Sequence, residues 1–150
     1  MTTKITTVYD YYVTQLNTLF SSMTRIPNPY SLEDNSINFL RAGYGLKLGG
    51  HNLFNADFCN IYQQYNFNVV FCREVIRMEH NATAFDDVVK NLNEDVFTFR
   101  EHFYDIDNNN SNIDKINLGA TDPVNFFVAG KNNFLFIETT ISTIIGENYR

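Results

Sequence analysis

The side chains whose spacing best suits chemistry lie in an acidic, asparagine-rich stretch. Asp105, Asp107 and Asn109 match positions one, three and five of a calcium-binding EF-hand loop. Position six is Asn110, where the turn requires glycine, and position twelve is Ile116, where the loop requires a bidentate glutamate. The pattern therefore predicts a solvated loop between a helix and a strand rather than a metal site.

Histidine and cysteine are the other residue types that could act as ligands or nucleophiles. The histidines share no ligand spacing with one another or with the cysteines. Glu79 beside His80 would suit an acid–base pair, but the sequence nearby supplies no nucleophile and no orienting partner. These observations predict no catalytic residue, no cofactor and no metal. The residues concerned are His51, His80, His102, Cys59 and Cys72.

The two cysteines are expected to have structural rather than chemical roles. Cys72 falls in a predicted strand, where it is expected to behave as a small buried apolar residue. Two cysteines in a chain of this size are expected to stay reduced, with a disulfide between Cys59 and Cys72 as the alternative.

Two glycine-containing stretches invite comparison with phosphate-binding loops. Gly43-Tyr44-Gly45 lacks the helix that must follow such a loop. Gly130-Lys131 is preceded by Asn125 at the position where the Walker pattern requires glycine. The first stretch therefore predicts a bend or bulge in a strand, and the second predicts a hairpin turn.

Length and charge limit the classes of protein to which the chain can belong. With 150 residues, 44% of them hydrophobic, it can bury a core without disulfides or metals. A formal net charge of -6 argues against nucleic-acid binding, which needs clustered lysine and arginine. The first residues contain no apolar signal core, and no apolar run approaches the length of a membrane span, so no membrane association is expected.

Two stretches have the apolar spacing of three and four that is typical of an amphipathic helix. The first covers about 3–23, with threonines at its start as caps and Pro27 and Pro29 after its end. The second covers about 83–104, with Thr83 as the expected N-cap. Its apolar stripe consists of Phe85, Val88, Val89, Leu92, Val96, Phe99 and Phe103.

Strands are predicted at about 37–48 and 62–77 and in a hairpin over about 124–145. From Tyr65 to Phe71 every second residue is apolar, which is the pattern of a strand with one buried face. Gly49-Gly50 is expected to close the first strand as a turn. The elements together predict a single α+β domain over 1–150, with a mainly antiparallel sheet of four to five strands and two helices packed on one face.

The second face of the strand at 62–77 is half apolar between Val70 and Ile76, and a monomer would normally expose less apolar surface than this. Arginines and lysines also fall in or near the predicted strands. These side chains, Arg73 among them, are expected either to pair with Glu74, Glu79 or Glu138 or to contact a neighbouring subunit, with simple solvation as the alternative. The predicted subunit interface consists of Arg41, Lys47, Val70, Glu74, Ile76, Arg77 and Glu138.

The order of the elements resembles that of the tail terminator (tail completion) proteins of long-tailed bacteriophages. Members of this family are small acidic α+β domains with an N-terminal helix, a long strand that leads into a helix packed on the sheet, and a closing hairpin. In this chain 3–23 resembles the first helix, 65–77 the long strand, 83–103 the second helix and 124–145 the final hairpin. The resemblance covers nearly the whole chain, in layout rather than in a short motif.

The resemblance implies a structural virion protein without enzymatic activity, assembled in the host cytoplasm as a homohexameric ring at the virion neck. Such a ring caps the tail tube protein and offers a surface to the head-completion or connector protein. Its sheet would approach the lumen, where a negative protomer lets DNA pass without sequence-specific binding. The asparagine-rich loop at 107–112 departs from the family layout, as either a contact arm or an insertion.

Other interpretations stay open on the sequence alone. In the same class is another neck or tail component, such as a head-closure, tube or minor tail protein. In a different class is a small cytosolic ligand-binding or enzymatic α+β domain, against which the lack of a convergent polar cluster counts. A third alternative is a chaperone-like adaptor for another assembly.

Overall fold

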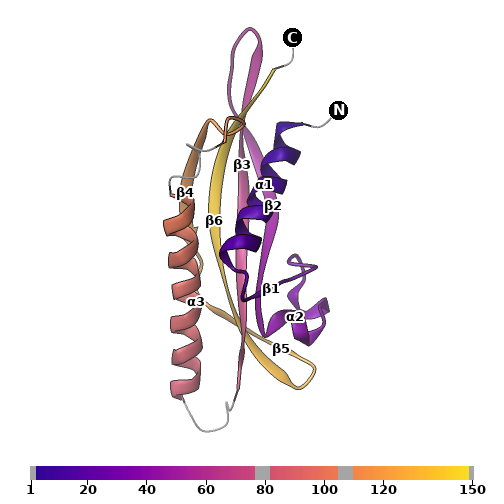
Figure 1. Ribbon diagram of the computed structural model, residues 1–150, viewed down its shortest axis with the longest axis vertical. Helices are drawn as coiled ribbons and strands as arrows, with labels where there is room; N and C mark the ends of the chain where they lie inside the picture. The colour runs from indigo at the N-terminus through magenta and orange to yellow at the C-terminus, as the bar shows by residue number, and fades with distance from the viewer. Residues whose placement is uncertain (1–2, 77–81, 105–109, 149–150) are drawn as a thin grey trace.

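A long β-sheet runs the length of the molecule beside two long helices, in a computed structural model that describes residues 3–76, 82–104 and 110–148 (Figure 1). The fold is α+β with a mostly antiparallel sheet, as predicted. In the described residues the sheet has six strands rather than four or five, and there are three α-helices rather than two. In chain order, the elements are α1 (Lys4–Leu19), β1 (Thr24–Arg25), the 3-10 turn η1 (Leu32–Asp34), α2 (Ile37–Leu40), β2 (Ala42–Ala56), β3 (Asn60–Val75), α3 (Ala82–Phe103), β4 (Lys115–Thr121), β5 (Asn125–Ala129) and β6 (Asn132–Asn148).

The strands lie in the order β1-β2-β3-β6-β4, and β5 pairs with the start of β6. β3 and β6 are antiparallel partners over their whole length, from Asn60 opposite Asn148 to Val75 opposite Asn133. β4 and β5 therefore occupy successive parts of the same outer edge of β6. The short β1 pairs in parallel with β2 at Gly43 and Tyr44 only.

One face of the sheet is covered by α1 and α3, which confirms that both predicted helices pack on the same face. The odd-numbered residues of β3, such as Phe67 and Phe71, point into this main core, as their alternation predicted. From the helices, Tyr12, Phe99 and Phe103 meet them, and the ring of Phe67 lies edge-on to that of Tyr12. Burial of these apolar side chains is the main source of stability for a fold of this kind.

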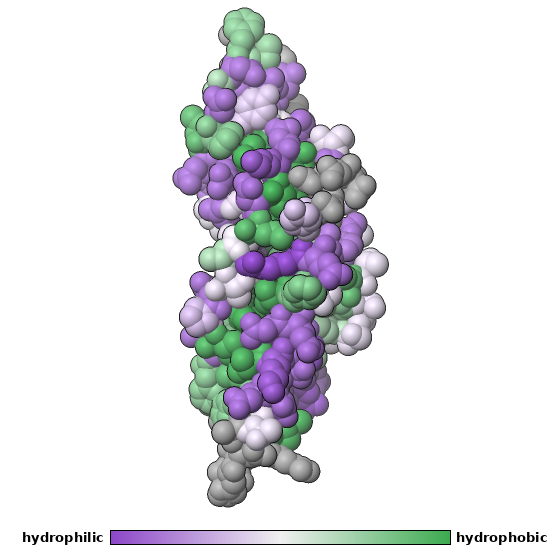
Figure 2. All heavy atoms as spheres, turned by 90° about the vertical axis from the view of Figure 1, so that its left-hand side faces the viewer, coloured by the Kyte–Doolittle hydropathy of each residue, from purple (hydrophilic) through white to green (hydrophobic). Residues whose placement is uncertain are grey.

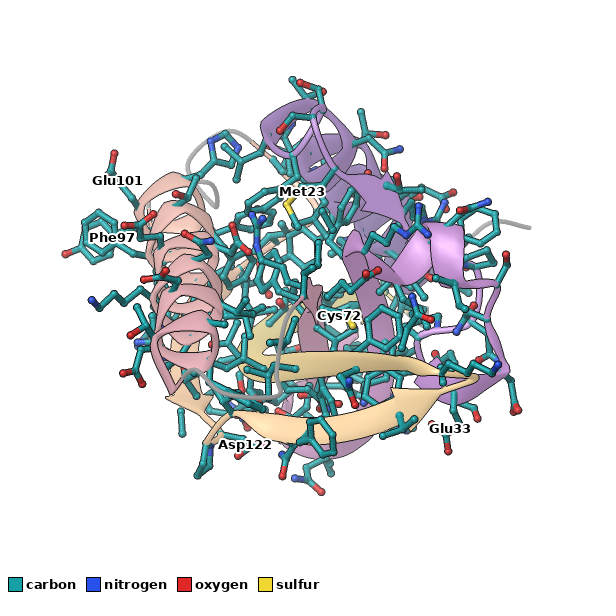
Figure 3. All side chains as sticks on the ribbon, turned by 90° about the horizontal axis from the view of Figure 1, so that it is seen from below. Met23, Glu33, Cys72, Phe97, Glu101 and Asp122 are labelled. Atoms are coloured by element: carbon teal, nitrogen blue, oxygen red, sulfur yellow. The ribbon has the colours of Figure 1, made fainter. Side chains whose placement is uncertain are left out.

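The opposite face is covered near its lower end by segments of the same chain, where a partner subunit was predicted. Val70 and Cys72 are fully buried there. The cover comes from residues that follow α1 and precede β2, together with the β5–β6 hairpin, and Figure 3 shows Cys72 in the interior of the fold. This second core contains Ile26, Leu32, Leu40, Val70, Cys72, Ala129 and Phe134.

Two glycines of β2 allow this cover to approach the strand closely. A Cβ atom on Gly43 would collide with the Phe39 carbonyl oxygen, and one on Gly45 would lie 2.6 Å from Cβ of Pro29. The predicted bend or bulge at these glycines is wrong, since β2 and β3 stay in register there and shift only between Leu48 and His51 and between Leu53 and Asn55. Both glycines thus serve close packing of the chain against the strand.

Several predicted boundaries are corrected. The first helix ends at Leu19 instead of residue 23. The amide of Phe20, the C-cap residue, donates to the Leu16 carbonyl. The stretch from Ile37 to Leu40 is the short helix α2 and only its continuation is a strand, which does not turn at Gly49-Gly50 but runs on to Ala56. β4 was not predicted at all. The hairpin turn before β6 is confirmed, with Gly130 at a φ of 64°.

Candidate interaction surface

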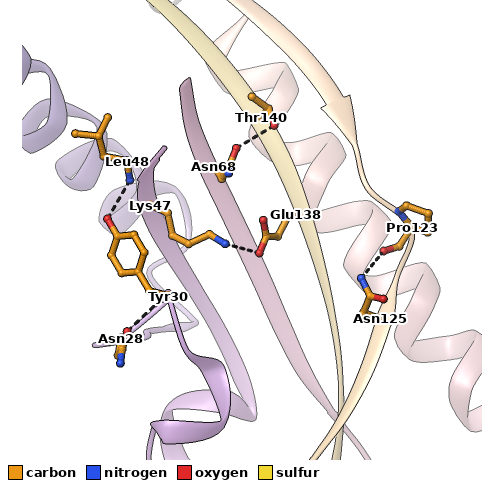
Figure 4. A network of polar contacts seen from close by, with 9 residues as sticks. All are labelled: Asn28, Tyr30, Lys47, Leu48, Asn68, Pro123, Asn125, Glu138 and Thr140. Carbon is orange, nitrogen blue, oxygen red and sulfur yellow. Dashed lines mark hydrogen bonds and ion pairs between the residues drawn. The ribbon is translucent and has the colours of Figure 1, made fainter. Parts of the chain in front are cut away.

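Four of the five charged residues of the predicted interface form two ion pairs within the chain. Arg41 Nε lies 3.1 Å from Glu74 Oε2, and Lys47 Nζ lies 2.5 Å from Glu138 Oε1 (Figure 4). Both pairings were among the expected ones. They form because Arg41, just before β2, and Lys47, within it, lie on the same sheet face as their partners on β3 and β6. Arg41 is largely exposed, whereas Lys47 and Glu138 are half-buried.

The Lys47–Glu138 pair lies beside a shallow hollow of about 160 Å³ on the second face of the sheet. The Tyr30 hydroxyl accepts a hydrogen bond of 3.1 Å from the Leu48 amide, which ties the preceding loop to β2 (Figure 4). Farther up the same face the Thr140 hydroxyl donates to Asn68 Oδ1 over 3.0 Å. These polar side chains satisfy one another across strands, so they need no ligand to complete them.

The remaining residues of the predicted interface have different fates. Val70 is buried inside the protomer, so it offers no surface to a neighbour. Ile76 is 67% exposed just after β3, as an interface residue would be in a free subunit. Arg77 lies outside the described residues. Of the predicted interface, the described residues that keep exposed surface are therefore Ile76 and the outer parts of the two ion pairs.

The upper end of the sheet exposes apolar side chains that the sequence did not single out. We call residues 49–58, which are all exposed, the β2–β3 tip. Within it Leu53, Phe54 and Phe58 are 68%, 58% and 73% exposed. In Figure 2 apolar atoms reach the upper extremity of the molecule. Because exposed apolar side chains on a projecting hairpin are typical of interaction sites, the tip is the candidate interaction surface of the chain.

The outer edge of β2 is open along this tip. In the described part of the chain, β1 pairs with Gly43 and Tyr44 and no strand pairs with that edge beyond them. Two register shifts, at Leu48/His51 and Leu53/Asn55, interrupt the edge. Bulges of this kind limit uncontrolled strand pairing, while the open amides and carbonyls between them can still accept a specific partner.

A second hollow of about 410 Å³ lies just below the tip, between the β2–β3 hairpin and the β4–β6 side of the sheet. Gly146 makes room for the ring of Tyr62, one of the lining residues, because a Cβ atom on Gly146 would lie 2.6 Å from Cε1 of Tyr62. The lining residues are Phe54, Asn55, Tyr62, Asp114, Lys115 and Ile144.

Within the described ranges, the candidate ligands and nucleophiles do not converge. His51 lies against the ring of Tyr65, with centroids 5.2 Å apart, and His102 Nε2 is 2.8 Å from Gln15 Oε1. His80 and the first three residues of the calcium-like pattern lie outside the described residues. Ile116, at position twelve of that pattern, packs against the main core. Among the described residues no group of three His, Cys, Asp or Glu side chains could hold a metal ion.

Both cysteines are free thiols, and they differ in exposure to solvent: Cys72 is buried, whereas Cys59 is partly exposed. Burial raises the pKa of the Cys72 thiol from its ordinary value of 9.0 to about 12. We therefore expect a thiol reagent at pH 8 to label Cys59 in the folded protein and Cys72 only after unfolding, because the thiolate is the reactive form. Mass spectrometry of the labelled peptides checks this, and rapid double labelling of folded protein would contradict it.

The same shift affects stability at high pH. The unfolded chain ionises Cys72 near pH 9, whereas the folded chain keeps it protonated until about pH 12. The unfolded state then binds fewer protons, so the contribution of Cys72 to the free energy of unfolding declines as the pH rises through this window.

Two arginines hold α3 on the sheet. Arg73 was expected to pair with Glu74, Glu79 or Glu138, or to contact a neighbouring subunit, but its partner is Asp95. Arg73 Nε and Nη2 donate to the two carboxylate oxygens of Asp95, over 2.8 and 2.9 Å. These hydrogen bonds raise the pKa of Arg73 above its usual value. Arg100 Nη2 donates to the Gly119 carbonyl and to the Thr121 hydroxyl, which fastens α3 to β4. Both contacts are structural.

No known protein family is identified for this chain. No protein-family model matches the chain, and no curated protein matches it. Among the described helices, none is long and apolar enough to cross a membrane.

Proposed function

We propose that the chain is a structural subunit that assembles with copies of itself into a ring, as the cap of a bacteriophage tail tube that joins the tube to the head connector. The observation that carries the proposal is the β2–β3 tip, where an open strand edge and exposed Leu53, Phe54 and Phe58 coincide. An edge strand offers backbone partners and the apolar side chains offer surface to bury, and both are elements of a stable subunit contact.

The distribution of charge supports contact between copies of the same chain. With a net charge of -6, two protomers repel each other through most of their surface. From Leu48 to Cys72, however, Asp57 is the only aspartate, glutamate, lysine or arginine. The tip is therefore a region where two acidic protomers can meet with little repulsion.

The two sides of the sheet also suit a closed ring. The upper part of β2 is open at one side, and β4 forms the other side. A contact between unlike surfaces on neighbouring copies generates a ring when the rotation between them closes. The net negative charge suits a ring through which DNA passes without binding.

Native mass spectrometry over a range of concentrations tests the proposal. We expect a closed oligomer, a hexamer if the tail-terminator assignment holds, and negative-stain images of rings with a central hole. Added tail tubes should carry the ring at one end. A chain that stays monomeric at all concentrations and does not bind tail tubes would exclude the proposal.

Variants at the tip sharpen this test. Replacing Leu53, Phe54 and Phe58 together with serine should weaken assembly by at least about 100-fold, since each buried leucine or phenylalanine contributes about 1.5–3 kcal/mol. The matched control is Phe97→Ser, which removes an equally exposed aromatic side chain that points outward from α3 (Figure 3). We expect the control to assemble like the unaltered chain and both variants to keep its circular dichroism spectrum.

A further inference from the structure

The outer side of α3 carries a row of side chains in which carboxylates and aromatic rings alternate. Glu94, Phe97 and Glu101 lie in the second half of the helix, and Tyr104 directly follows its last residue. Their spacings of three, four and three place them one turn apart on one side of the helix, and we call the four residues the α3 stripe. Figure 3 shows Phe97 and Glu101 projecting together from the outer side of α3. Each ring therefore has a carboxylate within one turn of it.

The side chains of the stripe are open to solvent. Phe97 and Tyr104 are 67% and 72% exposed, and both glutamates are exposed as well. The ion pairs within the described part of the chain include neither glutamate. The pKa of Arg73 is raised chiefly by its hydrogen bonds to Asp95, and Glu94 adds to this only through its charge. The carboxylates of the stripe thus keep their capacity to accept hydrogen bonds from a partner.

The charges around the stripe favour a basic partner. Besides the two glutamates of the stripe, α3 exposes the carboxylates of Asp86 and Asp87, and it exposes the ammonium group of Lys90. Arg100 lies one turn from both rings, but its Nη2 donates to acceptors on β4. Carboxylates are in excess even when both cations are counted, and the whole chain has a net charge of -6. A partner with positive charge is therefore attracted to this side of the molecule.

A second copy of the chain does not have the chemistry that this surface requires. No two lysines or arginines lie within three positions of each other in the sequence, so the chain contains no basic segment to offer to the stripe of a neighbour. Two acidic copies also repel each other. The stripe therefore suits a different protein.

We propose that the α3 stripe binds an arginine-bearing segment of another protein. A guanidinium group stacks on aromatic rings and also pairs with a carboxylate through two parallel hydrogen bonds, and arginine is the side chain that does both. Glu101 lies between the two rings, so one arginine can contact a ring and this carboxylate at the same time. The inference goes beyond the proposed assembly and does not depend on it, because the β2–β3 tip contributes no residue to the stripe.

A labelled model peptide of arginine and leucine, patterned as an amphipathic helix, tests the proposal by fluorescence anisotropy with the full chain. We expect it to bind at least about threefold more tightly than the same peptide with lysine, because lysine lacks the planar group that stacks and pairs at once. The same peptide with glutamate in place of arginine should not bind.

Two matched substitutions test the role of the carboxylate. Glu101→Gln should weaken binding of the arginine peptide by about threefold or more, which is the size of effect expected for an exposed ion pair. Glu33→Gln removes an exposed carboxylate on the other side of the molecule from α3 (Figure 3). This control should leave the affinity for the peptide unchanged.

Two substitutions at Phe97 separate stacking on a ring from the burial of apolar surface. Phe97→Leu keeps an apolar side chain without a ring and should weaken binding by about threefold, whereas Phe97→Trp supplies the ring that binds cations best and should strengthen it. Phe54→Ala is the control, because it removes a 58% exposed ring at the β2–β3 tip and should leave the affinity for the peptide unchanged. Circular dichroism checks that all variants are folded.

Three results would overturn the inference. The first is an arginine peptide that does not bind. The second is an equal loss in Glu101→Gln and Glu33→Gln, because it would reveal general attraction between an acidic chain and a cationic peptide. The third is a Phe97→Leu variant that binds as tightly as the unaltered chain. Native mass spectrometry without the peptide decides the assembly proposal separately, so either proposal can fail while the other stands.

Discussion

Replacing Asp95 with alanine is expected to lower the free energy of unfolding by about 3 kcal/mol. Asp95 is buried on α3, and its two carboxylate oxygens accept hydrogen bonds from Arg73 on β3. Without the carboxylate, the guanidinium remains against the core with its charge unpaired. The value lies at the low end for a broken buried pair, because 26% of the Arg73 side chain still contacts solvent.

Urea denaturation at low ionic strength measures this effect, and two further variants identify its cause. Removing both charges, as in Arg73→Met combined with Asp95→Leu, should restore most of the lost stability, because no charge is then left buried. Arg41→Ala removes one partner of an exposed pair and should lower the stability by less than about 1 kcal/mol. A loss in Asp95→Ala no greater than that in Arg41→Ala would contradict the argument.

The parts of the fold that were predicted correctly are those with a long, regular apolar pattern. The apolar stripe of α3 and the odd-numbered apolar residues of β3 line the main core over many positions, so the period alone identifies each element and the side that faces this core. The β5–β6 turn was predicted because Gly130 supplies the positive φ that the turn requires. In these segments local preference and tertiary packing agree.

The segments that were missed lack such a pattern for physical reasons. The upper half of β2 is an edge strand exposed on both faces, so none of its positions needs to be apolar. β4 has only Ile116 and Leu118 directed at the core, followed by a register shift, which leaves too few positions to show alternation. Pairing with a neighbour in space defines both strands, and that information is not local.

The pairing of Lys47 with Glu138 within the chain has a reason that can be stated. Alternation along the strands placed Lys47 and Glu138 on one face, and the structure brings them together. The covering of Val70 was not foreseen, because Ile26, Leu32 and Leu40 come from irregular or short segments that carry no periodic signal. The β2–β3 tip was missed because its exposed Leu53, Phe54 and Phe58 follow no regular spacing.

Val70→Asp tests directly whether this sheet face belongs to the core or to a subunit interface. Val70 is fully buried in the second core and lies opposite Glu138 in the pairing of β3 with β6. An aspartate there would be buried without a partner and beside a like charge, so we expect a loss of more than about 4 kcal/mol at pH 8, enough to unfold most of the chain. Urea denaturation and circular dichroism measure the effect.

The pH dependence and a matched control make the cause identifiable. Burial raises the pKa of such an aspartate, so its destabilising effect grows with pH above the unfolded value near 4 and is smaller at pH 5 than at pH 8. Ile76→Asp places the same charge one residue beyond β3, where the side chain is 67% exposed, and should change the stability by less than about 0.5 kcal/mol. If Val70→Asp instead remains folded at pH 8 and loses only assembly, the face is a subunit interface after all. A loss of stability in the unassembled chain that shrinks as the pH falls assigns Val70 to the interior, because protonation relieves the cost of burying the carboxylate.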